Sequence, residues 1–61
     1  MSKLLIHKLT NEEVKQSILD TADAFGEIRF FDSPAPQAMQ LVREGRLVRL
    51  SYLAFSLPEG G

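Results

Sequence analysis

A short segment with prolines at its start and a glycine at its end leads directly into the longest apolar stretch of the chain. Ser33-Pro34-Ala35-Pro36 opens this segment, Gly45 closes it, and residues 46–57 follow with eight apolar side chains and two charges. Proline is tolerated in the first turn of a helix, and glycine readily adopts the left-handed conformation that ends one. The pattern predicts a helix that delivers the chain into a strand, which organises a domain but indicates no particular chemistry.

The length of the chain limits how it can be stabilised. Its 61 residues suffice for one domain and include no cysteine. A domain of this size buries only about 60% of the surface that its unfolded chain exposes, so small domains often rely on disulfides, metals or association. The lack of cysteine excludes disulfides and thiolate zinc sites, which leaves association. We expect one domain over residues 1–57 and a flexible tail over 58–61.

Charge and hydropathy narrow the range of partners. The formal net charge is −1 and the apolar fraction is 44%, which is ordinary for a folded domain. The overall charge shows no basic footprint for nucleic acid. No apolar run approaches the roughly 20 residues that a membrane span needs, and the run at 4–6 is too short for a signal peptide. We expect no membrane partner and a cytoplasmic location.

Residues 11–25 carry the clearest helix pattern. Thr10 and Glu13 have the spacing of a capping box, in which each side chain bonds the backbone amide of the other residue. Gly26 is a typical left-handed stop after such a helix. The apolar side chains recur at helical spacing: Val14, Ile18, Ala22 and Phe25, with Leu19 beside them.

Two strands and a second helix account for most of the remaining chain. We expect strands over 3–9 and 27–32, the second with Ile28 and Phe30 on one face and Arg29 and Phe31 on the other. The second helix is expected to have Ser33 as its N-cap and Pro34 at its first position, and to end at Gly45. Its expected apolar stripe is Ala35, Ala38, Met39 and Val42, with Leu41 to one side.

Residues 46–57 fit either a strand or a helix, and a strand is favoured because Gly45, Tyr52 and Phe55 suit it better. The fold class predicted is α+β, in the order β-α-β-α-β, with a three-stranded sheet and two helices. Helical connections allow parallel pairing, and antiparallel pairing of the last strand is the alternative. An exposed apolar edge of such a small sheet would invite pairing with another chain.

The sequence offers few groups for catalysis. His7 is the only histidine, and no nucleophile-elbow pattern surrounds any serine. Four acids are expected on the solvated side of the first helix: Glu12, Glu13, Asp20 and Asp23. A chain this small does not easily enclose a ligand cavity of several hundred Å3. We therefore expect no enzymatic activity, no cofactor, no metal and no small-molecule substrate.

Three arginines gather at the junction between the second helix and the last strand. Arg43, Arg46 and Arg49 would suit contact with phosphate, but Glu44 lies among them and partly cancels their charge. The simpler interpretation is that Arg43 complements the helix end and the other two keep an apolar strand soluble. Tyr52 and Phe55 are candidate aromatic anchors for a partner, although Phe55 fits the core better.

These observations predict a small regulatory protein that binds another macromolecule. The first choice of partner is a protein or a second copy of the chain, as a homodimer or other homo-oligomer, and nucleic acid is the second. The candidate partner-binding residues are Arg43, Arg46, Arg49 and Tyr52.

Residues 39–50 resemble the recognition helix and first wing strand of winged-helix DNA-binding domains, which often show Arg-Glu-Gly before an apolar strand. Here Arg43-Glu44-Gly45 precedes such a strand. The resemblance implies DNA binding through the helix and the wing. The chain departs from this family, because residues 27–44 leave little room for a strand and two helices, and because no returning wing strand is predicted.

The Gly60-Gly61 ending is similar to that of ubiquitin-like sulfur carriers, whose thin tails enter an activating enzyme. This similarity implies a carrier function. Those folds open with a β-hairpin, whereas a single strand is predicted here before the first helix.

Overall fold

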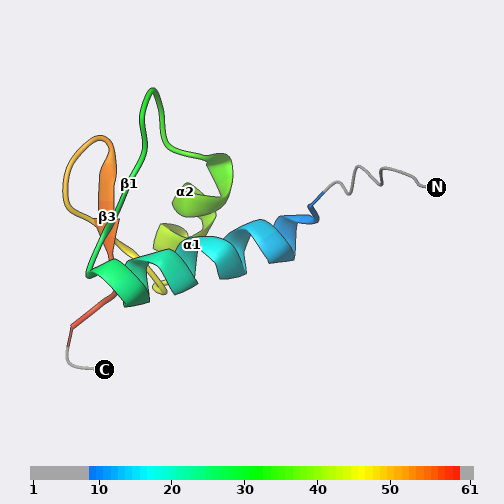
Figure 1. The fold of residues 1–61 in the computed structure, drawn as a ribbon, viewed down its shortest axis with the longest axis horizontal. Coiled ribbons are helices and arrows are strands. Elements are labelled where there is room, and N and C mark those ends of the chain that lie inside the picture. The colour runs from blue at the N-terminus through cyan, green and yellow to red at the C-terminus, as the bar shows by residue number, and fades with distance from the viewer. Residues whose placement is uncertain (1–8, 60–61) are drawn as a thin grey trace.

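The computed structural model describes residues 9–59, which form two helices and a three-stranded sheet (Figure 1). The elements are α1 (Asn11–Phe25), β1 (Ile28–Arg29), α2 (Pro36–Arg43), β2 (Val48–Arg49) and β3 (Ala54–Ser56). The predicted α+β class, with two helices and three strands, is confirmed. Apart from Leu9, which belongs to no element, the strand expected over 3–9 lies outside the described residues.

Helix α1 has the predicted bounds because its ends are determined locally. The Glu13 N–H donates to Thr10 Oγ1 at 3.2 Å, and the Thr10 N–H donates to Glu13 Oε1 at 2.8 Å. This capping box satisfies two backbone donors that the first turn leaves without helical partners. Gly26 ends the helix with φ +86°, and its N–H donates to the Ala22 carbonyl at 2.9 Å.

Helix α2 begins two residues later than expected. Its N-cap is Ala35 and its first residue is Pro36, rather than Ser33 and Pro34. A proline disfavours the helical conformation of the residue before it, so Pro36 keeps Ala35 extended, at φ −63° and ψ 145°. The second proline of the motif therefore determines the helix start.

The end of α2 is a Schellman motif built on Gly45. Gly45 has φ +77° and donates its N–H to the Val42 carbonyl, while the Arg46 N–H donates to the Leu41 carbonyl at 2.9 Å. These two bonds satisfy carbonyls that the last turn would otherwise leave unpaired. The predicted stop at Gly45 is confirmed.

The apolar stretch 46–57 is a hairpin and not one long strand. Strand β2 leads into the loop 50–53, and β3 returns beside it. The N–H groups of Leu50 and Ser51 both donate to the Ala54 carbonyl, at 2.8 and 3.1 Å. A single strand with apolar side chains on both faces would need a cover on each side. Folding back instead pairs the stretch with itself and leaves only one face to bury.

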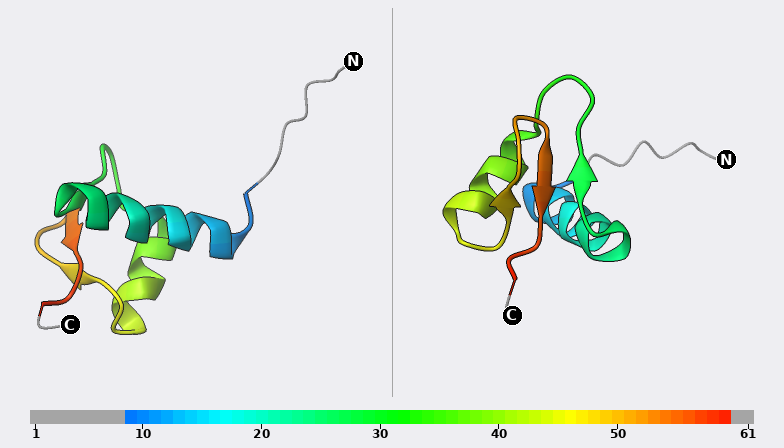
Figure 2. Two further views of the ribbon diagram at one scale, coloured as in Figure 1. Left: turned by 60° about the horizontal axis from the view of Figure 1, so that its bottom comes forward. Right: turned by 90° about the vertical axis from the view of Figure 1, so that its left-hand side faces the viewer.

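The sheet is antiparallel in the order β1-β3-β2, so the last strand lies in the middle. Ile28 and Arg49 both pair with Phe55, from opposite sides. Directly paired residues project from the same face of a sheet, so these three side chains share a face. Both helices lie behind the sheet when its broad face is viewed (Figure 2), and Phe55 and Ile28 of this row pack in the core, whereas Arg49 is exposed.

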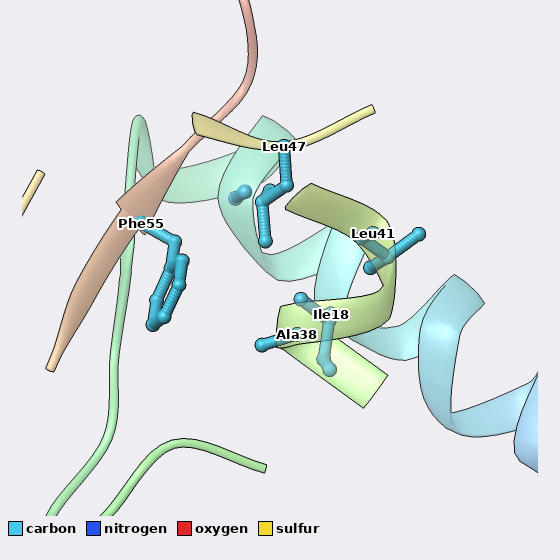
Figure 3. Close-up of a cluster of buried hydrophobic side chains, with 6 residues drawn as sticks. Ile18, Ala38, Leu41, Leu47 and Phe55 are labelled. Carbon is cyan, nitrogen blue, oxygen red and sulfur yellow. The ribbon is translucent and has the colours of Figure 1, made fainter. Parts of the chain in front are cut away.

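The core fills the space between the sheet and the two helices (Figure 3). Leu41 was expected beside the apolar stripe of α2 but is fully buried, as is Ala38 three residues before it. Leu41 lies on the side of α2 that meets both α1 and the sheet, so tertiary packing decides its burial. The buried cluster consists of Ile18, Ala22, Ala38, Leu41, Leu47 and Phe55.

Candidate interaction surface

Four large apolar side chains are exposed on the hairpin and on the segment that follows β1. Their exposed fractions are 95% for Phe31, 42% for Val48, 53% for Leu50 and 65% for Tyr52. We call these four residues the hairpin surface. The Phe30 N–H donates to the Leu53 carbonyl at 2.9 Å, so the segment after β1 and the loop 50–53 leave the same end of the sheet (Figure 2, right).

Two other large apolar side chains are exposed in the described part of the chain, and both lie elsewhere. Leu9 precedes α1, and Phe25 ends it with 79% of its surface exposed. Phe25 comes just before β1, whereas Phe31 comes just after it, so the two rings lie beyond opposite ends of this strand. Four of the six exposed large apolar side chains in residues 9–59 thus lie on the hairpin and on the segment that follows β1.

Arg49 binds the hairpin rather than projecting as a free charge. Its Nε donates to the Ser51 carbonyl at 3.2 Å, and its Nη2 donates to the Tyr52 carbonyl at 3.0 Å. The guanidinium carbon lies 5.3 Å from the centre of the Tyr52 ring and 5.6 Å from that of Phe55. Both distances suit a cation–π contact. Arg49 therefore links the buried ring to the exposed one.

Arg46 is engaged by a carboxylate that also binds a buried lysine. Glu44 Oε2 accepts from Lys15 Nζ at 2.7 Å, and Glu44 Oε1 accepts from Arg46 Nη1 at 3.3 Å. The hydrogen bond from Lys15 is the main reason that the pKa of Glu44 lies below its ordinary value of 4.5, and Arg46 contributes in the same direction. Glu44 is therefore ion-paired with both cations.

Lys15 is a buried residue that sequence reasoning missed. Only 7% of its surface is exposed, although lysine is almost never buried without a partner. Its place in the sequence carries a signal, because Lys15 precedes Ile18 by three residues and Ala22 by seven. That spacing puts it on the inward side of α1, where its ammonium reaches Glu44 across the interface with α2.

The third candidate arginine has no charged partner among the described residues. Arg43 is exposed in the last turn of α2, and within residues 9–59 it forms no ion pair. The three arginines thus occupy three different environments: a free surface, a carboxylate bridge and the hairpin loop. They do not form a joint anion site.

The expected polar face of α1 is present, because Glu12, Glu13, Asp20 and Asp23 are all exposed. Over residues 9–59 we find no pocket and no group of three or more side chains suited to a metal ion. No helix in this range has the length and apolar character needed to cross a membrane. His7 and the Gly60-Gly61 ending both lie outside the described residues.

Phe31, Val48 and Leu50 were not singled out from the sequence as partner-binding residues, unlike Tyr52. Val48, Leu50 and Tyr52 alternate with period two in the sequence. A single long strand over 46–57 would carry apolar side chains on both faces, so the pattern did not indicate which face is exposed. The turn at 50–53 contains no glycine, proline or asparagine to reveal the hairpin.

Comparison with known proteins returned no relative. No protein-family model matches the chain, and no curated protein or solved structure matches it.

Proposed function

We propose that this protein is a small non-catalytic binding protein that self-associates through the hairpin surface. The observation that carries the proposal is that the hairpin and the segment following β1 hold four exposed large apolar side chains: Phe31, Val48, Leu50 and Tyr52. Contiguous exposed apolar patches on small proteins mark interaction sites. Aromatic side chains such as Tyr52 are frequent centres of binding energy.

Charge favours a protein partner over a nucleic acid. The chain has eight acidic and seven basic residues, for a formal net charge of −1. Glu44 is ion-paired with Arg46, and the Arg49 guanidinium donates to two loop carbonyls. Binding to a nucleic acid backbone gains most of its strength from cations that neutralise phosphates. Of the three candidate arginines, only Arg43 is free for that purpose.

A second copy of the chain is a suitable occupant of the hairpin surface. In a two-fold dimer the same patch meets itself, so exposed apolar groups on one copy cover those on the other. A chain without disulfides has few other ways to gain buried area. The proposed dimer therefore supplies stability as well as function.

The first prediction concerns Tyr52. Sedimentation velocity over a concentration range should show association of the wild-type protein at micromolar concentration. Tyr52→Ala should raise the dissociation constant of self-association by about 30-fold. This factor corresponds to the roughly 2 kcal/mol that defines a binding hot spot. Phe25→Ala, which removes another exposed aromatic ring away from the hairpin, should leave association unchanged. A wild-type protein that stays monomeric at several hundred micromolar would refute the proposal.

A winged-helix type of DNA binding is the second candidate, and one specific observation favours it. Helix α2 is followed by a hairpin, in a sheet of order β1-β3-β2, so a strand that the sequence did not predict returns beside β2, as a wing would require. One helix of the winged-helix pattern is still missing between β1 and β2. Salt-sensitive binding of duplex DNA that Arg43→Ala weakens and Tyr52→Ala does not would favour this candidate instead.

A further inference from the structure

We propose that Arg49 is a positioning residue, which holds the loop 50–53 in the conformation that presents Tyr52 to a partner. Sequence reasoning placed Arg49 among the residues that contact a partner. Its bonds to the hairpin itself indicate a different role. This inference deepens the proposed function of the hairpin surface and rests on it.

The register of the hairpin brings Arg49 to the loop. Arg49 lies directly opposite Phe55, and the Leu50 N–H donates to the Ala54 carbonyl at 2.8 Å. This bond makes Arg49 and Phe55 a non-hydrogen-bonded pair, the kind in which opposite side chains come closest. The Arg49 side chain therefore starts against the Phe55 ring, which is fully buried in the core.

From this base the guanidinium reaches the loop with two donors. Its Nε and Nη2 donate to the carbonyls of Ser51 and Tyr52, and its central carbon lies 5.3 Å from the Tyr52 ring centre and 5.6 Å from that of Phe55. The planar guanidinium of arginine supplies two donors in fixed positions together with a face that can stack on a ring. The ammonium of lysine has no such plane. The Tyr52 ring thus has the guanidinium near it and still exposes 65% of the residue.

Few other hydrogen bonds hold the loop 50–53 in place. Apart from the Arg49 bonds, residues 51–53 are held by the Ser51 N–H to the Ala54 carbonyl and by the Leu53 carbonyl to the Phe30 N–H. Without the two guanidinium donors, the Ser51 and Tyr52 carbonyls would accept hydrogen bonds from water instead. The Tyr52 ring would then sample more conformations. A partner would then have to order the loop on binding, which costs affinity.

Arg49→Lys tests this role because it keeps the charge and removes the planar guanidinium. The dissociation constant of self-association should rise roughly 2- to 12-fold, the range expected for ordering one side chain. The loss should be the same at low and high salt, because no charge is removed. Arg46→Lys is the matched control, since Arg46 binds Glu44 and not the loop, and it should leave association unchanged.

A second measurement tests the mobility of the Tyr52 ring in the free monomer. Tyr52 is the only tyrosine and the chain has no tryptophan, so intrinsic fluorescence reports on this ring alone. Time-resolved fluorescence anisotropy of dilute protein should show faster local motion of Tyr52 in Arg49→Lys than in the wild type or in Arg46→Lys. A purely structural role of Arg49 would lower the melting temperature without changing this local motion in the folded protein.

The two measurements separate the outcomes. If Tyr52 becomes more mobile in Arg49→Lys but the wild type does not associate, the proposed function fails and the positioning of Tyr52 stands. If the wild type associates and Arg49→Lys changes neither affinity nor Tyr52 motion, the positioning role is overturned. An affinity loss that disappears at high salt would identify Arg49 as a contacting charge and would also overturn it.

Discussion

At the scale of single residues, the least expected feature is the placement of one carboxylate. Glu44 is the C-cap of α2, where the helix dipole disfavours negative charge. Two cations compensate: the ammonium of buried Lys15 from α1 and the guanidinium of Arg46 two residues later. Removing Glu44 would leave the Lys15 ammonium with Glu12 alone, 3.7 Å away. Glu44 is therefore the main counter-ion that allows a lysine to be buried between the helices.

This arrangement predicts a pH-dependent contribution to stability. Since the folded protein holds the pKa of Glu44 below 4.5, the ionised carboxylate stabilises the fold above the unfolded pKa. That contribution is lost as the pH falls through the lower, folded pKa. Glu44→Gln should therefore lower the urea midpoint at pH 7, and its difference from the wild type should shrink as the pH approaches 3.

Lys15→Met provides the complementary variant, because it removes the main donor to Glu44 and fills similar space. Its difference from the wild type should also shrink at acid pH. A Glu44→Gln difference of equal size at pH 7 and pH 3 would show that the Lys15 bond does not stabilise the folded protein.

At the scale of elements, the turn between α2 and β2 decides where the hairpin begins. Gly45 has a positive φ, and a side chain at this position would meet nothing within 4 Å. Substitution there is therefore limited by backbone conformation and not by contact. This turn directs the chain from α2 into Leu47, which is 2% exposed and belongs to the core.

Gly45→Ala should destabilise the protein by about 1–2 kcal/mol, the cost of the left-handed conformation for a residue with a Cβ. Gly45→Asn should cost less, because asparagine tolerates this conformation. Urea denaturation of the three proteins should give the order Gly, Asn, Ala from most to least stable. Equal stability of the alanine and asparagine variants would contradict this explanation.

At the scale of the whole molecule, the core is small. The core consists of six buried side chains, two of which are alanines. They come from both helices, from β3 and from the residue before β2. A chain of this length has a total stability of roughly 3–9 kcal/mol. Each large core side chain therefore represents a considerable part of the stability, which is one reason that association would benefit this protein.

Leu41→Ala should remove about 2–5 kcal/mol, the usual cost of emptying a fully buried leucine site, and should leave the protein largely unfolded at 37 °C. Phe25→Ala is the control, because Phe25 is 79% exposed outside the hairpin surface and its loss should cost less than about 1 kcal/mol. Thermal melts followed by circular dichroism compare the two variants. A Leu41→Ala melt close to that of the wild type would contradict the described core.

Features that depend on neighbouring residues were determined by the sequence alone. The capping box of Thr10 and Glu13, the stop at Gly26 and the stop at Gly45 all involve backbone groups within a few residues, so sequence spacing was enough to predict them. Alternation likewise predicted that Ile28 and Phe30 share one face and Arg29 and Phe31 the other, and it is the first pair that packs against the core.

The tertiary structure alone decided what depends on contacts between distant segments. The split of residues 46–57 into β2 and β3 follows from pairing β3 with β1 as well as β2, and no local turn signal marks it. The burial of Lys15 requires Glu44, 29 residues away. The partners of Arg46 and Arg49 are only two or three residues away, but the fold brings Lys15 of α1 to the same Glu44 carboxylate and brings the Phe55 ring beside Arg49.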